Sequence, residues 1–141
     1  MYNRFVTLLG IAFFIGMLTH ACQPNVSIET AQYAVNGQKL YTTPCENCHG
    51  AKGEGLGKLY PPLTDSSYLS QHRDKLACIV KFGLKEPVEI HGQRYEEQMP
   101  GVPQLSDIEI AYILTYVTTR FGKNTESYTL EEVQKALKAC K

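Results

Sequence analysis

Two cysteines and a histidine lie close together in the first half of the chain, as Cys45, Cys48 and His49 in the pentapeptide CENCH. Two thiols three positions apart can add to the vinyl groups of a haem as thioethers, and a histidine directly after them can bind the iron. The spacing therefore predicts covalent attachment of a haem, with His49 as the proximal ligand. No second CxxCH occurs in the 141 residues, so we expect one haem.

Other kinds of site also use two cysteines at this spacing. A redox-active disulfide needs a thioredoxin-like βαβ context, and a zinc site needs further ligands nearby. The sequence offers neither, because His72 and His91 have no cysteine or histidine at ligand spacing and His20 lies in a predicted signal peptide. The pattern favours haem attachment.

A single methionine, Met99, remains once Met1 and Met17 leave with the signal peptide. It lies in the run QMPG, and a loop of proline and glycine is a poor place for a core side chain. A soft thioether suits haem iron as the sixth ligand and raises the reduction potential. We therefore predict that Met99 is the second axial ligand.

Two stretches after His49 are expected to shape the surroundings of the haem. Residues 50–57 contain four glycines, so we expect a loop that follows the haem edge. Pro61 and Pro62 come next, and proline donates no hydrogen bond, which leaves free carbonyls in this stretch. One such carbonyl can accept the outer N–H of His49, and the sequence leaves open which one.

Residues 1–21 have the features of a signal peptide. Arg4 gives a short positive region, and residues 5–18 are uncharged and mostly apolar. A run of about 14 residues is too short to span a bilayer comfortably but suits a signal-peptide core. We therefore expect the protein to be exported.

The segment before Cys22 resembles the lipobox of bacterial lipoproteins, in which the cysteine is lipidated and becomes the mature N-terminus. Thr19 and His20 depart from its usual aliphatic and small residues. Thr19 and Ala21 would also serve an ordinary signal peptidase, which would release a soluble protein. We favour lipidation, because it explains a cysteine directly after the apolar run, and residues 22–28 would then be a tether.

Five cysteines are present, and the haem and the lipid would use three of them. A leftover pair in an exported protein commonly forms a disulfide, so we predict a bond between Cys78 and Cys140. If Cys22 is not lipidated the count is odd and this reasoning weakens. The alternative is two buried free thiols.

The composition suits one folded domain, expected at residues 29–141, because 43% of the residues are hydrophobic and 20% are charged. Fourteen basic residues balance fourteen acidic ones, and removing the segment that contains Arg4 leaves 13 against 14. The chain has no basic field for nucleic acid, so we expect no such partner. Recognition of protein partners must depend on local patches.

Apolar residues at helical spacing, bounded by N-caps, capping boxes or glycine, predict four helices, and alternation predicts a small hairpin or an extended loop. Gly37 indicates close contact between the first helix and another, since glycine within a helix costs about 1 kcal/mol against alanine. The helices are expected at residues 29–43, 65–82 with a break near Ser70, 106–121 and 129–140, and the hairpin at residues 86–95. Their expected buried faces are Tyr33, Gly37, Leu40 and Tyr41; Leu69, Leu76, Ile79, Val80 and Phe82; Ile110, Ile113, Leu114 and Val117; and Leu130, Val133, Leu137 and Cys140.

From residue 30 to residue 122, the order of helix, CENCH, glycine-rich loop, double proline, helices and QMPG resembles a small monohaem class I bacterial cytochrome c. The resemblance implies an all-α class I cytochrome c fold around one haem c, in which the helix with Gly37 crosses the helix with Leu114. The Cys78 and Cys140 pair and the last helix are additions to the minimal pattern.

The resemblance also implies the roles of the site residues. Cys45 and Cys48 would be thioether-bound, and His49 and Met99 would be the axial ligands. Pro61 or Pro62 would orient His49.

Filled axial positions leave the iron no open site, so its chemistry is reversible one-electron transfer. The resemblance implies a carrier rather than an enzyme, with a quinol-oxidising complex or dehydrogenase as donor and a terminal oxidase or reductase as acceptor. We expect a monomer on the periplasmic face of a bacterial membrane, lipid-anchored or soluble. The alternatives are a peroxidase-like or gas-binding haem protein, in which Met99 is displaced and His72 or His91 lies nearby, and a haem-free lipoprotein with a structural CxxC disulfide.

Overall fold

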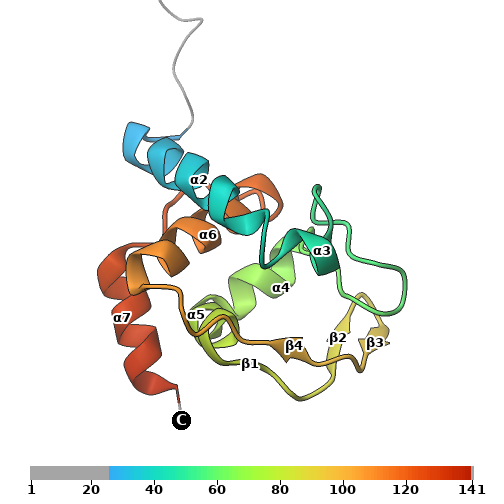
Figure 1. Ribbon diagram of the computed structural model, residues 1–141. Helices are drawn as coiled ribbons and strands as arrows, with labels where there is room; N and C mark the ends of the chain where they lie inside the picture. Colours follow the sequence, from blue (N-terminus) through green and yellow to red (C-terminus); the bar gives the residue numbers. More distant parts are fainter. Residues whose placement is uncertain (1–25, 141) are drawn as a thin grey trace, which may run out of the picture.

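The computed structural model describes residues 26–140, which fold mainly into helices (Figure 1). The helices are α2 Ile28–Tyr41, α3 Glu46–His49, α4 Ser66–Gln71, α5 Arg73–Phe82, α6 Asp107–Arg120 and α7 Leu130–Ala139. The strands are β1 Gly83–Leu84, β2 Val88–Ile90, β3 Gln93–Tyr95 and β4 Met99–Pro100. Antiparallel pairing joins β1 to β4 and β2 to β3, so the predicted hairpin is present and a second short ladder joins distant segments.

Helices α2 and α6 form a closely packed pair. Gly37 is buried in α2, and a Cβ atom there would overlap the carbonyl oxygen of Tyr112 in α6. One turn away, the rings of Tyr33 and Tyr112 meet edge to face with centroids 4.7 Å apart. The close helix contact expected from Gly37 is confirmed, and it is the backbone of α6 that requires the glycine.

Replacing Gly37 by alanine is expected to destabilise the protein by about 1–3 kcal/mol, the usual cost of overpacking. The higher helix propensity of alanine would offset only about 1 kcal/mol of this cost. The clash itself would remain, because the Cβ atom meets backbone, which cannot rotate away as a side chain can. Denaturant unfolding of the holoprotein measures the change. Asn36→Ala, at an exposed position of the same helix, should change the free energy of unfolding by less than about 0.5 kcal/mol. Equal stability of G37A and the wild type would contradict the packing described here.

The second predicted helix is two helices that meet at His72. The backbone of His72 has φ −110° and ψ 18°, outside the helical region, and its ring stacks on Tyr68 at 4.2 Å. Its Nδ1 atom lies 2.9 Å from the carbonyl oxygen of Tyr68, which ties the ring back to α4. The break therefore lies two residues beyond Ser70, the position that the sequence indicates.

Helix α7 packs against α5 at the edge of the molecule (Figure 1). Cys78 in α5 and Cys140, directly after α7, form a disulfide. Arg73 at the start of α5 donates from Nε to Glu132 Oε1 at 2.7 Å and lies over the ring of Tyr128, 3.8 Å from its centroid. These contacts join α5 to both ends of α7.

Two residues expected on buried faces are exposed instead. Phe82 is 60% exposed, because it lies about 200° around α5 from the buried Val80. Leu130 is 38% exposed, since it is the first residue of α7 and the helix becomes fully buried only at Val133, one turn later. Apolar residues at helical spacing therefore do not show at which residue the buried face of a helix begins or ends.

Removing the Cys78–Cys140 bond is expected to lower the free energy of unfolding by about 2–4 kcal/mol. The bond closes a loop of 62 residues, for which the chain-entropy estimate is about 4 kcal/mol. The double variant Cys78→Ala/Cys140→Ala, compared with wild-type holoprotein in guanidinium, measures the loss. Ser70→Ala, at an exposed position, is the control. A double variant as stable as the wild type would show that the bond contributes nothing.

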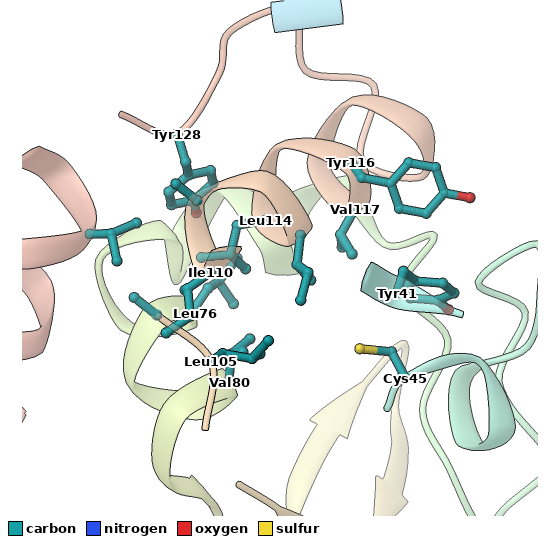
Figure 2. Packing of buried hydrophobic residues seen from close by; sticks show 14 of the residues in the cluster. Tyr41, Cys45, Leu76, Val80, Leu105, Ile110, Leu114, Tyr116, Val117 and Tyr128 are labelled. Carbon is teal, nitrogen blue, oxygen red and sulfur yellow. The ribbon is translucent and has the colours of Figure 1, made fainter. Parts of the chain in front are cut away.

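One apolar core joins α2, α5, α6 and α7 (Figure 2). The largest fully buried side chains of the domain come from α2, α6, α7 and the segment between α6 and α7: Tyr41, Ile110, Ile113, Thr115, Tyr128 and Val133. The rings of Tyr41, Tyr116 and Phe121 form a cluster in which each pair of ring centroids lies within 5.7 Å. This core fixes the end of α2, from which the chain passes directly to CENCH.

Candidate haem-binding site

A cavity lies between α3, α5, α6 and the segments around β2 and β4. The empty space between its walls, open mouth included, is about 1240 Å³. The wall is mostly aliphatic and aromatic. The predicted site residues Cys45, Cys48, His49, Pro61, Pro62 and Met99 all line it, together with Leu76, Ile79, Val80, Val88, Ile90, Ile113, Leu114 and Val117.

One helical turn presents Cys45, Cys48 and His49 to this cavity. Cys45 is the N-cap of α3, and the His49 N–H donates to the Cys45 carbonyl at 2.9 Å, so the motif closes on itself. The sulfur of Cys45 points toward the side chains of Val80 and Leu105 (Figure 2), of which Val80 lines the cavity. Burial raises the pKa of the Cys45 thiol to about 11, so without haem the thiol is protonated at neutral pH.

The ring of His49 is fixed by a proline carbonyl. Its Nδ1 atom lies 2.9 Å from the carbonyl oxygen of Pro61, and a carbonyl can only accept, so the proton is on Nδ1. Burial lowers the pKa of His49, against the raising effect of this hydrogen bond, and so favours the neutral ring. The lone pair of Nε2 is therefore free for a metal, and Pro61 rather than Pro62 orients the ring.

The glycine-rich loop does not follow the cavity as expected. None of residues 50–57 lines the cavity wall. The loop folds on itself instead, because Gly55 N–H donates to the His49 carbonyl at 2.8 Å and Leu63 N–H donates to the Gly53 carbonyl at 2.8 Å. Gly53 lies against the ring of Phe121. The glycines serve this tight return, which brings Pro61 back to His49.

Met99 lies on the wall of the same cavity, in β4 and half-buried. Strand β1, which continues α5, pairs with β4 and places Leu84 opposite Met99 and Gly83 opposite Pro100. A side chain at Gly83 would overlap the carbonyl of Met99, and its φ of +85° also favours glycine. The methionine is therefore presented by ordered backbone and not by a free loop.

The other two histidines of residues 26–140 do not line the cavity. The Nδ1 atom of His72 is engaged by the Tyr68 carbonyl. His91 is exposed at the turn of the hairpin, with Nε2 3.2 Å from Asp65 Oδ2. Neither is placed as a distal group of an open haem site.

The competing uses of CENCH find no support in the described part of the chain. Cys45 and Cys48 are not bonded to each other. Between residues 26 and 140, no three histidine, cysteine or acidic side chains gather as a metal site would require. The thiols and the imidazole instead share one apolar cavity, and this donor set fits a haem held by two thioethers and one nitrogen ligand.

The roles of two residues in this region, Tyr41 and Lys81, cannot be predicted from the sequence. The hydroxyl of Tyr41 donates to the Gly50 carbonyl at 2.7 Å, which fastens the end of CENCH to the core. The ammonium of Lys81 donates hydrogen bonds to the carbonyls of Pro103 and Leu105, which follow the strand that contains Met99. From the sequence, Tyr41 is recognisable only as a helix residue and Lys81 only as a surface lysine. The reason is that their hydrogen-bond partners lie in other elements, 9 residues along the chain for Tyr41 and 22 and 24 residues for Lys81.

The N-terminal predictions concern residues outside those described. They are the signal peptide at residues 1–21, lipidation of Cys22 and most of the tether at residues 22–28. The described chain starts at residue 26, and α2 begins at Ile28. No helix among residues 26–140 is both long enough and apolar enough to cross a membrane.

Comparison with known proteins identifies related sequences. Residues 34–120 match the family Cytochrom_C, described as cytochrome c. The chain is 32% identical over 109 residues to a cytochrome c-552 of Thermus thermophilus, an alignment covering 71% of this chain and 82% of the relative. It is also 32% identical over 109 residues to a second cytochrome c-552, from the strain ATCC 27634 of the same species, with 73% of that relative covered.

Proposed function

The chain belongs to the cytochrome c family, and from this premise we propose that it carries single electrons between respiratory redox partners on the periplasmic side of a bacterial membrane. It is an electron-carrying haem protein with covalently attached haem c. Its fold is the expected class I cytochrome c fold, mainly helical, with an additional C-terminal helix.

The observation that carries the proposal is the presence of His49 and Met99 on the wall of one apolar cavity that also contains Cys45 and Cys48. We assign the cysteines to the thioethers and His49 and Met99 to the axial positions. Bound there, haem supplies reversible exchange between Fe(II) and Fe(III). Two filled axial positions would leave no place for a substrate, which favours a carrier over an enzyme.

The surrounding residues would support this role in two ways. The Pro61 carbonyl holds the His49 ring in one orientation, so little rearrangement accompanies electron exchange. The aliphatic wall, including Ile113 and Val117, keeps water from the metal and favours the less charged reduced state.

Absorption spectra of protein matured in an exporting host with haem-attachment machinery test the assignment. We expect a narrow six-coordinate ferrous spectrum and the weak ferric sulfur-to-iron band of methionine ligation. Carbon monoxide should bind the reduced protein only slowly and weakly. A high-spin spectrum that shifts at once with carbon monoxide would show an open iron and exclude the simple carrier.

We further propose that Cys22 is lipidated and that the monomeric domain is anchored to the membrane, where a quinol-oxidising complex or dehydrogenase reduces it and a terminal oxidase or reductase oxidises it. The sequence before Cys22 supports the anchor. Mass spectrometry of the mature N-terminus should find a diacylglyceryl group on Cys22, and C22A should leave the membrane fraction. A mature protein that starts elsewhere and lacks lipid would replace the anchor by a soluble periplasmic carrier.

A further inference from the structure

The segment after Met99 runs along the C-terminal end of α5 and is held there by backbone bonds. Strand β4 pairs with β1 over only two residues on each side. Two residues further on, the Val102 N–H donates to the Val80 carbonyl at 2.9 Å. Gly101 allows this approach, because a Cβ atom there would lie 2.6 Å from the carbonyl carbon of Phe82.

A single lysine fastens the far end of the same segment. Lys81 Nζ donates to the Pro103 carbonyl at 2.8 Å and to the Leu105 carbonyl at 2.5 Å. Lys81 is half-buried in the last turn of α5, where a positive charge is favourable near the free carbonyls of the helix end. Across residues 26–140, no other side chain donates a hydrogen bond to the backbone of residues 99–105.

The same ammonium also faces the start of α6. Ser106 caps α6, and its hydroxyl and N–H both donate to the carboxylate of Glu109. These bonds chiefly hold the pKa of Glu109 below its usual range, and the charge of Lys81 adds to the effect. Lys81 thus ties α5 to the junction between the Met99 segment and α6.

We propose that Lys81 is a positioning residue for Met99: its ammonium holds residues 103–105 against α5, so that β4 stays paired with β1 and the thioether stays at the cavity. The proposal deepens the function proposed above and rests on Met99 as an axial ligand. The two-residue ladder is short, and at its other end β4 follows the loop from the β2–β3 hairpin. Without Lys81, the carbonyls of Pro103 and Leu105 would turn to water and the segment could lift as a unit.

The test compares three holoprotein variants. Lys81→Met keeps the aliphatic stem and removes the three donors, whereas Lys81→Arg keeps the charge and donors. Lys75→Met removes an exposed lysine from the same helix. The sulfur-to-iron band is followed during heating, alongside global unfolding by circular dichroism, and carbon monoxide is added to each reduced protein.

In K81M we expect the sulfur-to-iron band to disappear at a temperature below that of global unfolding. We also expect carbon monoxide to bind about tenfold more tightly than in the wild type. This factor corresponds to the loss of one charge-assisted hydrogen bond. K81R should restore most of both properties, and K75M should match the wild type. A band that falls together with global unfolding in K81M, or carbon monoxide binding unchanged from the wild type, would overturn the proposal.

Hydrogen exchange of the unmodified holoprotein keeps the test decisive if K81M does not fold. The Val102 amide should exchange at least about tenfold more slowly than amides of the β2–β3 hairpin, because it opens only with the clamped segment. Equal rates would show that Lys81 holds nothing in place. If the wild type lacks the sulfur-to-iron band, the axial role of Met99 fails, while the exchange rates still report on the clamp.

Discussion

Replacing Met99 by alanine is expected to lower the reduction potential by about 0.1 V or more, within the roughly 0.8 V range over which axial ligands set haem potentials. The thioether stabilises the reduced iron. In M99A the sixth position would hold a water molecule or stay empty. The sulfur-to-iron band should disappear, and the reduced protein should bind carbon monoxide rapidly. Potentiometric titration and carbon monoxide difference spectra measure both effects.

Gln98→Ala is the matched control for M99A. Gln98 precedes Met99 on the same cavity wall and is exposed, so the potential of Q98A should stay close to that of the wild type. An unchanged potential in M99A would show that Met99 is not a ligand and would revive the alternative of an open haem site.

Replacing His49 by alanine is expected to reduce the yield of stable holoprotein by at least about tenfold. Loss of a group that only orients a metal ligand typically costs 10–100-fold in affinity, and His49 is assigned as the ligand itself. The change would also leave the Pro61 carbonyl without its donor inside the cavity wall. Covalently bound haem per protein, measured by the pyridine haemochrome spectrum, reports the yield.

His91→Gln is the control for H49A, because His91 is exposed and lies outside the cavity wall. Its holoprotein yield should equal that of the wild type. Normal yield and a six-coordinate spectrum in H49A would mean that another side chain is the proximal ligand.

Much of the site was predictable because its chemistry is local in the chain. Cys45, Cys48 and His49 lie within one helical turn, so their spacing alone brings them to one side of α3. The same holds for the caps of α6 and α7, where Ser106 bonds Glu109 and Thr129 accepts from the Glu132 N–H. Gly37 was informative for a related reason, since a glycine within a helix marks a neighbour that leaves no room for a side chain.

Residue types and their local spacing were enough to predict the attachment motif, the candidate ligands and the order of the helices, since each follows from contacts within a turn or two. Folding in three dimensions was needed to show which carbonyl orients His49, where the glycine-rich loop goes, and which helix faces end exposed. It was also needed to show that the strand carrying Met99 pairs with β1 and that Lys81 binds the segment beyond it. The physical reason is that these contacts join residues far apart in the chain, and only packing around the shared core sets their distance and orientation.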